Sequence, residues 1–426
     1  MKLRSVTLTN YRCHDGLTVE FPEQLCVIVG VNGAGKTSLL KGIAEAFNPL
    51  GQRIVPFAEP GTQRLLVTEV NGRFRFEPQF PVQVKAVASV GNETFQWTVT
   101  MPIGSPVRPP YDNTLPMHVE RNVSIHGSPI FAFYRASRSW ANPGDTGANI
   151  FAQALNKRES RQDAFQGWWD ASVDQAGFRA WVIARCLERF QRSSEQGVLF
   201  DKINDDELAI VNSALRKALP GFQTLKFDVS QRSLIVQSKD DEEETQRLRS
   251  FDNLSDGERT IIGLVADITR RMCLLNPEMK DEVAVQTTGV VLIDELDLHL
   301  HPGWQRIITN ALTTAFPQVQ FIVASHSPQI LGEVRPEQIV MLRTGRPEHP
   351  DVSYGLDSAE ILETIMGAPP RAPEIGDLIR EIFSFIENSN LAEARGTLEE
   401  LKRKAPRIPE ITRAEALLKR KETLGR

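Results

Sequence analysis

The chain contains little cysteine, no long apolar run and no excess of positive charge. Its four cysteines lie far apart in the 426 residues, and none forms a Cys-x-x-Cys pair. This spacing argues against a disulfide framework and against a zinc site, and it fits a reducing cytoplasm. The most apolar runs are about 5–8 residues long, far short of the ~20 that a membrane span requires. The first twenty residues alternate like a strand and lack the apolar segment of a signal peptide.

The net charge of −5 gives no global basic field of the kind that indicates binding to nucleic acid. DNA remains a possible partner only through a local patch, for which the candidates are Arg135, Arg138, Lys157, Arg158 and Arg161. A solvated face is the alternative interpretation of the same residues. The composition, 41% hydrophobic and 24% charged, is typical of a soluble globular protein. The length suggests two or three domain-sized units.

A glycine-rich segment near the N-terminus carries the first chemical signal. Residues 30–37, GVNGAGKT, match the P-loop pattern, and they follow an apolar strand at 25–29 and precede a helix at 36–47. Glycines allow the backbone N–H groups to curl around phosphate oxygens, and the helix directs its positive end at the same anion. A chance glycine-rich turn is the alternative, but the flanking strand and helix argue against it. The predicted nucleotide-binding residues are Gly30, Asn32, Gly33, Ala34, Gly35, Lys36, Thr37 and Ser38.

Two later strands end in polar residues. Residues 290–293 are apolar and run into Asp294 and Glu295, which is the Walker B pattern. We expect Thr37 to hold Mg²⁺ directly, Asp294 to hold it through water, and Lys36 to contact the β- and γ-phosphates. We expect Glu295 to act as the general base on the attacking water or to position that water. The strand at 320–324 ends near His326, which is positioned to contact the γ-phosphate. A solvated acidic turn and a structural histidine are the alternatives.

A third motif, residues 254–258 with the sequence LSDGE, precedes a predicted helix at 260–275. Ser255 and Asp256 are typical helix-capping residues, and Gly257 allows close approach of a phosphate. A plain helix N-cap is the alternative. These five residues become a specific signal only together with the P-loop and the Walker B strand. We refer to residues 254–258 as the signature motif.

The P-loop, the signature motif, the Walker B strand with its glutamate and the following histidine together resemble the ABC-type ATPase heads of the RecF/SMC/OLD group. The block at 292–302 is similar to PtuA-type ATPases of the Septu and retron anti-phage systems, as are the segments 10–12, 130–135 and 413–418. The resemblance implies binding of ATP and Mg²⁺, ATP hydrolysis, and a homodimer in which Ser255 and Gly257 act on the nucleotide of the opposite protomer. It also implies that Asp297 crosses the dimer interface.

Some features depart from this resemblance. No convincing Q-loop glutamine is present; Gln63 and the strand end at Tyr134 and Arg135 are the two candidates. The segment between the P-loop and the signature motif lacks sustained heptads, so the long-armed SMC and DNA-break-tethering classes are excluded. His299 and His301 suggest a metal pair, but without an acidic or cysteine partner a structural or interface role is the stronger interpretation.

The expected fold is α/β: an ABC-type head with a parallel sheet and an antiparallel β-lobe, a helical insertion and a C-terminal helical tail. The β-lobe spans the alternating segments between 64 and 133, with a surface loop at 102–116. We expect the first half of the head at 1–147, the insertion at 148–225, the second half at 226–368 and the tail at 369–426. A short acidic run at 240–244 is interpreted as a solvated loop.

Two functions from different classes follow. The first is a cytoplasmic ATPase that controls a separate nuclease effector, such as an HNH protein, because no nuclease constellation follows the ATPase motifs. The second is a RecF-like repair clamp whose dimer holds duplex DNA. A transporter ATPase subunit is a weaker third possibility, because transport heads keep a clear Q-loop. The helical tail is the expected docking element for a partner or for a larger oligomer.

Overall fold

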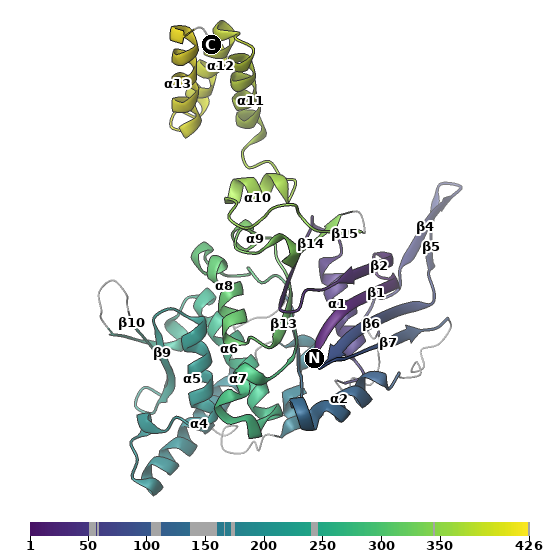
Figure 1. The fold of residues 1–426 in the computed structure, drawn as a ribbon, viewed down its shortest axis with the longest axis vertical. Coiled ribbons are helices and arrows are strands. Elements are labelled where there is room, and N and C mark those ends of the chain that lie inside the picture. The colour runs from purple at the N-terminus through teal and green to yellow at the C-terminus, as the bar shows by residue number, and fades with distance from the viewer. Residues whose placement is uncertain are drawn as a thin grey trace. The chain divides into compact units, whose positions relative to one another are not determined.

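The computed structural model describes residues 1–50, 57, 59–103, 112–136, 160–165, 167–171, 175–239, 246–343 and 346–424. A six-stranded sheet forms its centre, in the order β15-β14-β3-β13-β12-β8 (Figure 1). Every pairing in this sheet is parallel except that of β15 with β14. The strands are β3 (Leu25–Val29), β8 (Ile130–Tyr134), β12 (Gly289–Ile293), β13 (Val319–Ala324), β14 (Ile339–Arg343) and β15 (Arg346–Glu348).

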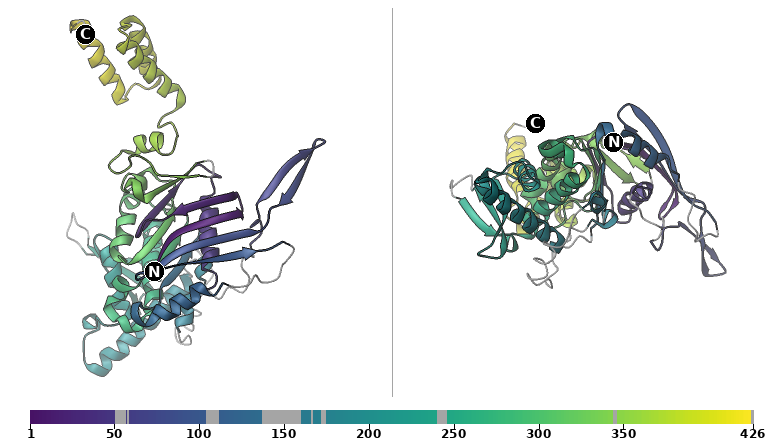
Figure 2. Two further views of the ribbon diagram at one scale, coloured as in Figure 1. Left: turned by 45° about the vertical axis from the view of Figure 1, so that its right-hand side comes forward. Right: turned by 90° about the horizontal axis from the view of Figure 1, so that it is seen from below.

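Strands β3, β8, β12 and β13 are buried along their whole length. Strands that are apolar on both faces are characteristic of a parallel sheet covered by helices on each side. Helix α1 (Lys36–Phe47) covers one face, and α6 (Asp256–Leu275) lies over the other, where Tyr134 of β8 donates a hydrogen bond to Asp267. Figure 2 shows the same division from two further directions. The sheet therefore separates the P-loop helix from the helix that follows the signature motif.

An antiparallel sheet, β2-β1-β6-β7, packs on the outer side of α1 and forms the predicted β-lobe. Leu8 of β1, Ile43 of α1 and Leu292 of β12 share one continuous core with it. The indole N–H of Trp97 donates to the carbonyl of Ala46 at 2.7 Å and fastens the lobe to the helix. These strands are β1 (Lys2–Tyr11), β2 (His14–Glu20), β6 (Val82–Val90) and β7 (Glu93–Met101).

Two features of this region differ from the expectation. The predicted surface loop at 102–116 is partly wrong, because helix α2 (Thr114–His126) begins inside it. Asp112 accepts hydrogen bonds from the backbone N–H groups of Thr98 and Thr114, so it joins β7 to the start of the helix. The strand predicted near residue 64 pairs in a separate two-stranded ribbon, β4 (Leu65–Val70) with β5 (Arg73–Pro78).

The other face of the central sheet carries the second lobe. Helix α5 (Glu207–Ala218) packs on α6 and α8, and a three-stranded antiparallel sheet, β11-β10-β9, packs on α4 and α5. The remaining bounds are α4 (Gln175–Gln196), α7 (Val283–Gln286), α8 (Pro302–Ala315), α9 (Pro328–Leu331), β9 (Phe222–Asp228), β10 (Ser233–Lys239) and β11 (Gln246–Ser250).

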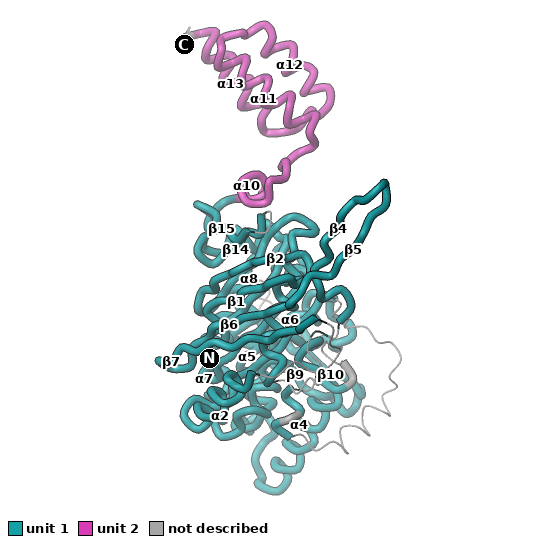
Figure 3. Tube along the Cα trace, turned by 90° about the vertical axis from the view of Figure 1, so that its right-hand side faces the viewer, with its two compact units in different colours: residues 1–356 teal, residues 357–426 magenta. Residues whose placement is uncertain are grey.

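The chain divides into two compact units, residues 1–356 and 357–426 (Figure 3). The second unit contains α10 (Ser358–Thr364), α11 (Pro373–Glu387), α12 (Leu391–Lys404) and α13 (Pro409–Leu424). Helices α11 to α13 share their own apolar core, in which Ile382, Leu398 and Ala414 are buried. Lys421 of α13 donates to the carbonyls of Ile386 and Glu387 and so caps the end of α11. The finer boundaries predicted inside the first unit stay predictions.

Across the described parts of the chain, no helix combines the length and the apolar character that crossing a membrane demands.

Candidate functional site

The P-loop connects β3 to α1 and takes a shape that only glycine permits at two positions. Gly33 and Gly35 have φ values of +83° and +96°, in the left-handed region. A Cβ on Gly35 would also lie 2.5 Å from the His14 ring and 2.7 Å from the Cys13 sulfur. Gly35 is the N-cap of α1, and because it has no side chain, it leaves the first N–H groups of the helix available to a phosphate.

Lys36, the first residue of α1, folds back over the P-loop. Its Nζ donates to the carbonyls of Gly30 at 2.8 Å and Val31 at 3.2 Å. Burial lowers the pKa of Lys36, and the negative charges of Asp294, Glu295 and Asp297 oppose this shift. Lys36 therefore lies near the carboxylates of Asp294, Glu295 and Asp297 and over the P-loop.

The end of β12 brings the first carboxylate against the P-loop helix. Asp294 is buried, and its Oδ2 accepts a hydrogen bond from the hydroxyl of Thr37 at 2.9 Å. Two oxygens bound at right angles on Mg²⁺, each about 2.1 Å from the metal, lie about 2.9–3.0 Å apart. The observed spacing therefore fits a shared Mg²⁺, with the remaining positions left to phosphate oxygens and water.

Glu295 follows Asp294 in a backbone conformation that is rare for a residue with a side chain. Its φ is +50°, and its carbonyl accepts from the N–H of Leu298 at 3.0 Å, which closes a tight turn. Left-handed φ values outside glycine concentrate at functional sites, because the surrounding structure must hold them in place. The turn therefore begins immediately after Asp294, at the end of β12.

His326 lies just beyond the end of β13 and is tied to the segment after Glu295. Asp297 accepts hydrogen bonds from the hydroxyl of Ser325 at 2.6 Å and from the backbone N–H of His326 at 3.2 Å. Burial and the charge of Lys36 lower the pKa of His326, whereas the three nearby carboxylates oppose the shift. A neutral imidazole is therefore favoured near neutral pH, with one ring nitrogen able to donate to a phosphate oxygen.

The signature motif has a different immediate environment. Ser255 is the N-cap of α6: its Oγ accepts from the N–H of Glu258, and its own N–H and hydroxyl donate to the Glu258 carboxylate, each at 3.0 Å. This capping box is the plain structural role weighed from the sequence. A Cβ on Gly257 would lie 2.9 Å from the carbonyl of His299, so the backbone of the same chain already explains this glycine.

The structure assigns places to the remaining candidates. Tyr134 lies beside the Walker B strand, where its carbonyl accepts from the N–H of Asp294, whereas Gln63 contacts Met101 in the β-lobe. His301 is the N-cap of α8 and accepts from the N–H of Gly303, a structural role. Arg161 pairs with Glu278 at 2.9 Å. Arg138, Lys157, Arg158 and the acidic run at 240–244 lie outside the described residues.

Sequence reasoning missed Glu59, whose carboxylate contacts side chains from several segments of the chain. It pairs with Arg12, Lys41 and Arg135 at 2.9, 2.7 and 2.9 Å and accepts from the indole N–H of Trp169 at 3.2 Å. Its partners come from the β1–β2 turn, α1, the residue after β8 and a 3-10 helix at Trp168–Asp170. Such a hub has no local sequence signal, because the partners are up to 110 residues away in the chain.

Two family models match the chain. Residues 1–70 match an "AAA ATPase domain", and residues 144–332 match "AAA domain, putative AbiEii toxin, Type IV TA system". The chain is an ATPase. The first match contains the P-loop, and the second contains the signature motif, the Walker B strand and His326.

Several curated proteins are similar to this ATPase. The retron Ec83 probable ATPase of Escherichia coli is 39% identical over 173 residues, which is 40% of this chain but only 30% of that protein. The retron Vc95 probable ATPase of Vibrio cholerae serotype O1 biovar El Tor is 25% identical over 91% of this chain and 84% of its own. The Septu protein PtuA of Bacillus thuringiensis is 24% identical over 88% and 87%. A solved SMC head bound to a winged-helix domain of ScpA aligns with a TM-score of 0.49 at 12% identity, covering 83% of this chain and 98% of that one.

Proposed function

We propose that this chain is the cytoplasmic ATPase subunit of a retron- or Septu-type anti-phage system, and that it controls a separate nuclease effector. Support comes from the curated ATPases that align with it over most of their length and from the site that the fold assembles. The effector would be a distinct protein, for example of the HNH class. The nuclease partner and the defence role are the parts of this proposal that depend most on the relatives.

The contact between Thr37 and Asp294 carries the chemical part of the proposal. It brings the P-loop and the Walker B strand to one metal-binding position, 257 residues apart in sequence. Lys36 would neutralise the β- and γ-phosphates, and Mg²⁺ held at Thr37 and Asp294 would supply further charge stabilisation. Glu295 would orient the attacking water and accept its proton, and His326 would donate to the γ-phosphate.

We further propose that hydrolysis requires two copies of the chain. The central sheet lies between α1 and α6, so the helix that begins at the signature motif lies on the face opposite to the P-loop helix. In a symmetric dimer, Ser255 and Gly257 of each protomer would contact the ATP bound by the other, and Asp297 would lie at the interface. An interface of this kind is isologous, so two identical nucleotide sites form or neither does.

The first test is Glu295→Gln, which keeps the shape of the side chain but cannot accept the proton. We expect ATP turnover to fall by roughly a hundredfold or more and an ATP-bound dimer to accumulate, measured by light scattering after size exclusion. Glu337→Gln, an exposed change of the same kind, is the matched control. Unchanged turnover in Glu295→Gln would remove this residue from the reaction.

The second test uses the same variant as bait in its native host, without nuclease treatment. A stoichiometric nuclease retained with the ATP-bound dimer would support the defence role. Retention of DNA without a protein partner would instead support the RecF-like clamp. Of the basic residues considered for DNA, Arg135 and Arg161 are paired with acidic side chains, which does not favour the clamp.

A further inference from the structure

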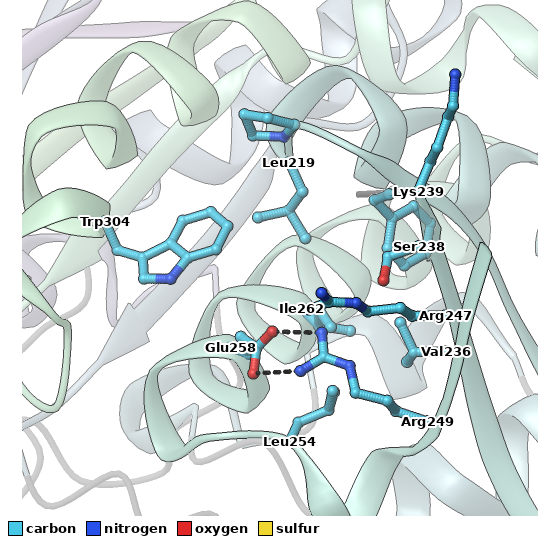
Figure 4. Close-up of a pocket in the computed structure, with 12 residues that line it drawn as sticks. Leu219, Val236, Ser238, Lys239, Arg247, Arg249, Leu254, Glu258, Ile262 and Trp304 are labelled. Carbon is cyan, nitrogen blue, oxygen red and sulfur yellow. Dashed lines mark hydrogen bonds and ion pairs between the residues drawn. The ribbon is translucent and has the colours of Figure 1, made fainter. Parts of the chain in front are cut away.

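A cavity of about 350 Å³ lies next to the signature motif and outside the nucleotide site described above (Figure 4). Its walls come from β10, β11, the end of α5, the first turns of α6 and the start of α8. Leu254 and Glu258 of the signature motif are part of the lining. Cavities of this size are in the range that encloses a small organic ligand.

The two sides of the cavity differ in chemistry. The half-buried indole of Trp304 lies on one side, and the Ser238 hydroxyl and the Arg247 guanidinium project from the opposite side (Figure 4). The Arg249 and Glu258 ion pair lies between them. Lys239 is a further cationic side chain, so the described residues that line the cavity include Lys239, Arg247 and Arg249 together with the Glu258 carboxylate.

This arrangement selects a flat ring that carries an anion. An indole offers a face for stacking an aromatic ring, and stacking of this kind tolerates any base. An arginine fork binds phosphate oxygens in pairs, and the serine hydroxyl opposite Trp304 can donate a further hydrogen bond. We infer that this cavity binds a nucleoside monophosphate, with its base against Trp304 and its phosphate against Arg247 and Arg249.

Occupancy of the cavity reaches the signature motif through one ion pair. Arg249 holds both carboxylate oxygens of Glu258, at 2.6 and 3.3 Å, and Glu258 accepts from the N–H and hydroxyl of Ser255. A phosphate at Arg249 competes with Glu258 for the guanidinium. This competition alters the hydrogen bonds that Glu258 accepts from Ser255. Ligand binding therefore changes ATP turnover, and this consequence rests on the proposed trans role of Ser255.

The binding test uses Lys36→Ala protein, in which the P-loop lysine is absent. Equilibrium dialysis with AMP, CMP, adenosine and inorganic phosphate measures affinity for the second site. We expect one nucleoside monophosphate per chain, bound at least about tenfold more weakly after a further Arg247→Glu or Trp304→Ala change. Lys217→Glu, an exposed reversal of charge on α5 outside the cavity, should leave the affinity unchanged.

Other outcomes overturn the inference. If Lys36→Ala protein binds no monophosphate at millimolar concentration, or binds it equally after Arg247→Glu, the cavity is not the site. If inorganic phosphate binds as tightly as AMP, Trp304 contributes no ring recognition. Failure of the proposed ATP dimer leaves this binding result intact, because the measurement is made without a functional P-loop. Loss of dimerisation and loss of the second site are thus separable.

Discussion

At the scale of a single residue, Ser255 has a structural role as a helix cap and a proposed catalytic role. The two roles compete for one hydroxyl proton. A serine hydroxyl has one proton, and in the single chain that proton is donated to Glu258. To contact the γ-phosphate of a second protomer, Ser255 must redirect it. The capping box would therefore hold the signature serine in place before the proposed dimer forms, and the nucleotide of the second protomer would replace Glu258 as the acceptor.

The change Ser255→Arg tests this exchange. A long cation at this position cannot enter the proposed interface, so we expect turnover to fall by about a hundredfold or more while ATP binding to the P-loop of the same chain is unaffected. Titration with a fluorescent ATP analogue separates the two effects. Ser255→Asn keeps the helix cap and is the control for stability. Loss of ATP binding in Ser255→Arg alone would show that the signature motif does not act in trans.

The residues of the nucleotide site could be predicted because their signals are local. Lys36, Thr37 and Asp294 each lie at the end of an apolar strand or the start of a helix, and parallel strands bring such ends to one edge. Glu59 and Arg249 could not be predicted. Glu59 acts through partners from distant segments. Arg249 pairs with Glu258 only nine residues away, but an isolated glutamate or arginine in a sequence is typical of a solvated surface.

Glu59 gives a prediction about pH. Burial acts to raise its pKa, but hydrogen bonds from Lys41 and Trp169 and the charges of Lys41 and Arg135 outweigh burial and lower the pKa to about 2. A depressed pKa stabilises the fold above the unfolded value of about 4.5 and loses this effect as pH falls towards 2. Against Glu59→Gln, the wild type should be more stable by roughly 2–3 kcal/mol at pH 7, and the difference should shrink at pH 3.5.

Urea unfolding at pH 7, 5 and 3.5, followed by tryptophan fluorescence, measures this difference. Glu348→Gln, on the exposed strand β15, is a control that should show little pH-dependent change. A constant gap between wild type and Glu59→Gln across this range would mean that the ion pairs of Glu59 contribute nothing that depends on its charge.

At the scale of elements, one buried side-chain amide joins β13 to β1, which lies 317 residues earlier in the sequence. Gln320 is fully buried; its Oε1 accepts from the N–H of Leu3 at 2.7 Å, and its Nε2 donates to the carbonyls of Leu3 and Pro22. The sequence predicts the strand at 320–324 from its apolar run, but it gives no sign that the first residue pairs with a segment 317 residues away. Helix α2 was not predicted, because the proline-rich stretch before it favours a loop.

Replacement of Gln320 by leucine should therefore destabilise the first unit by about 1–3 kcal/mol, the usual cost of leaving buried polar groups without a partner. The midpoint and slope of a urea unfolding curve at neutral pH provide the measurement. Gln96→Leu, on an exposed position of β7, makes the same chemical change without burial. Equal stability of the two variants would contradict the proposed role of Gln320 in fixing β1 to the central sheet.

At the scale of the whole molecule, the C-terminal unit is separable from the ATPase head in its contacts. Helices α11 to α13 bury Leu378, Leu401 and Leu418 against one another, and Lys404 pairs with Glu374 between two of them at 2.5 Å. An element with its own core can be removed without opening the core of the head. The proposed docking role requires such independence, because the unit would then bind a partner while the head responds to its nucleotide.

Deletion of residues 374–426 tests whether the C-terminal helices bind the partner while the head hydrolyses ATP without them. Because the head keeps all of its catalytic residues, its melting temperature and ATP turnover per chain should stay close to those of the full chain. The proposed nuclease should no longer be recovered when Glu295→Gln protein lacking this segment is the bait. Persistent recovery of the nuclease would place the docking surface on the head, and loss of turnover would show that the helices support catalysis directly. The helices alone, added in excess, should compete with the full chain for the partner if the docking surface lies within them.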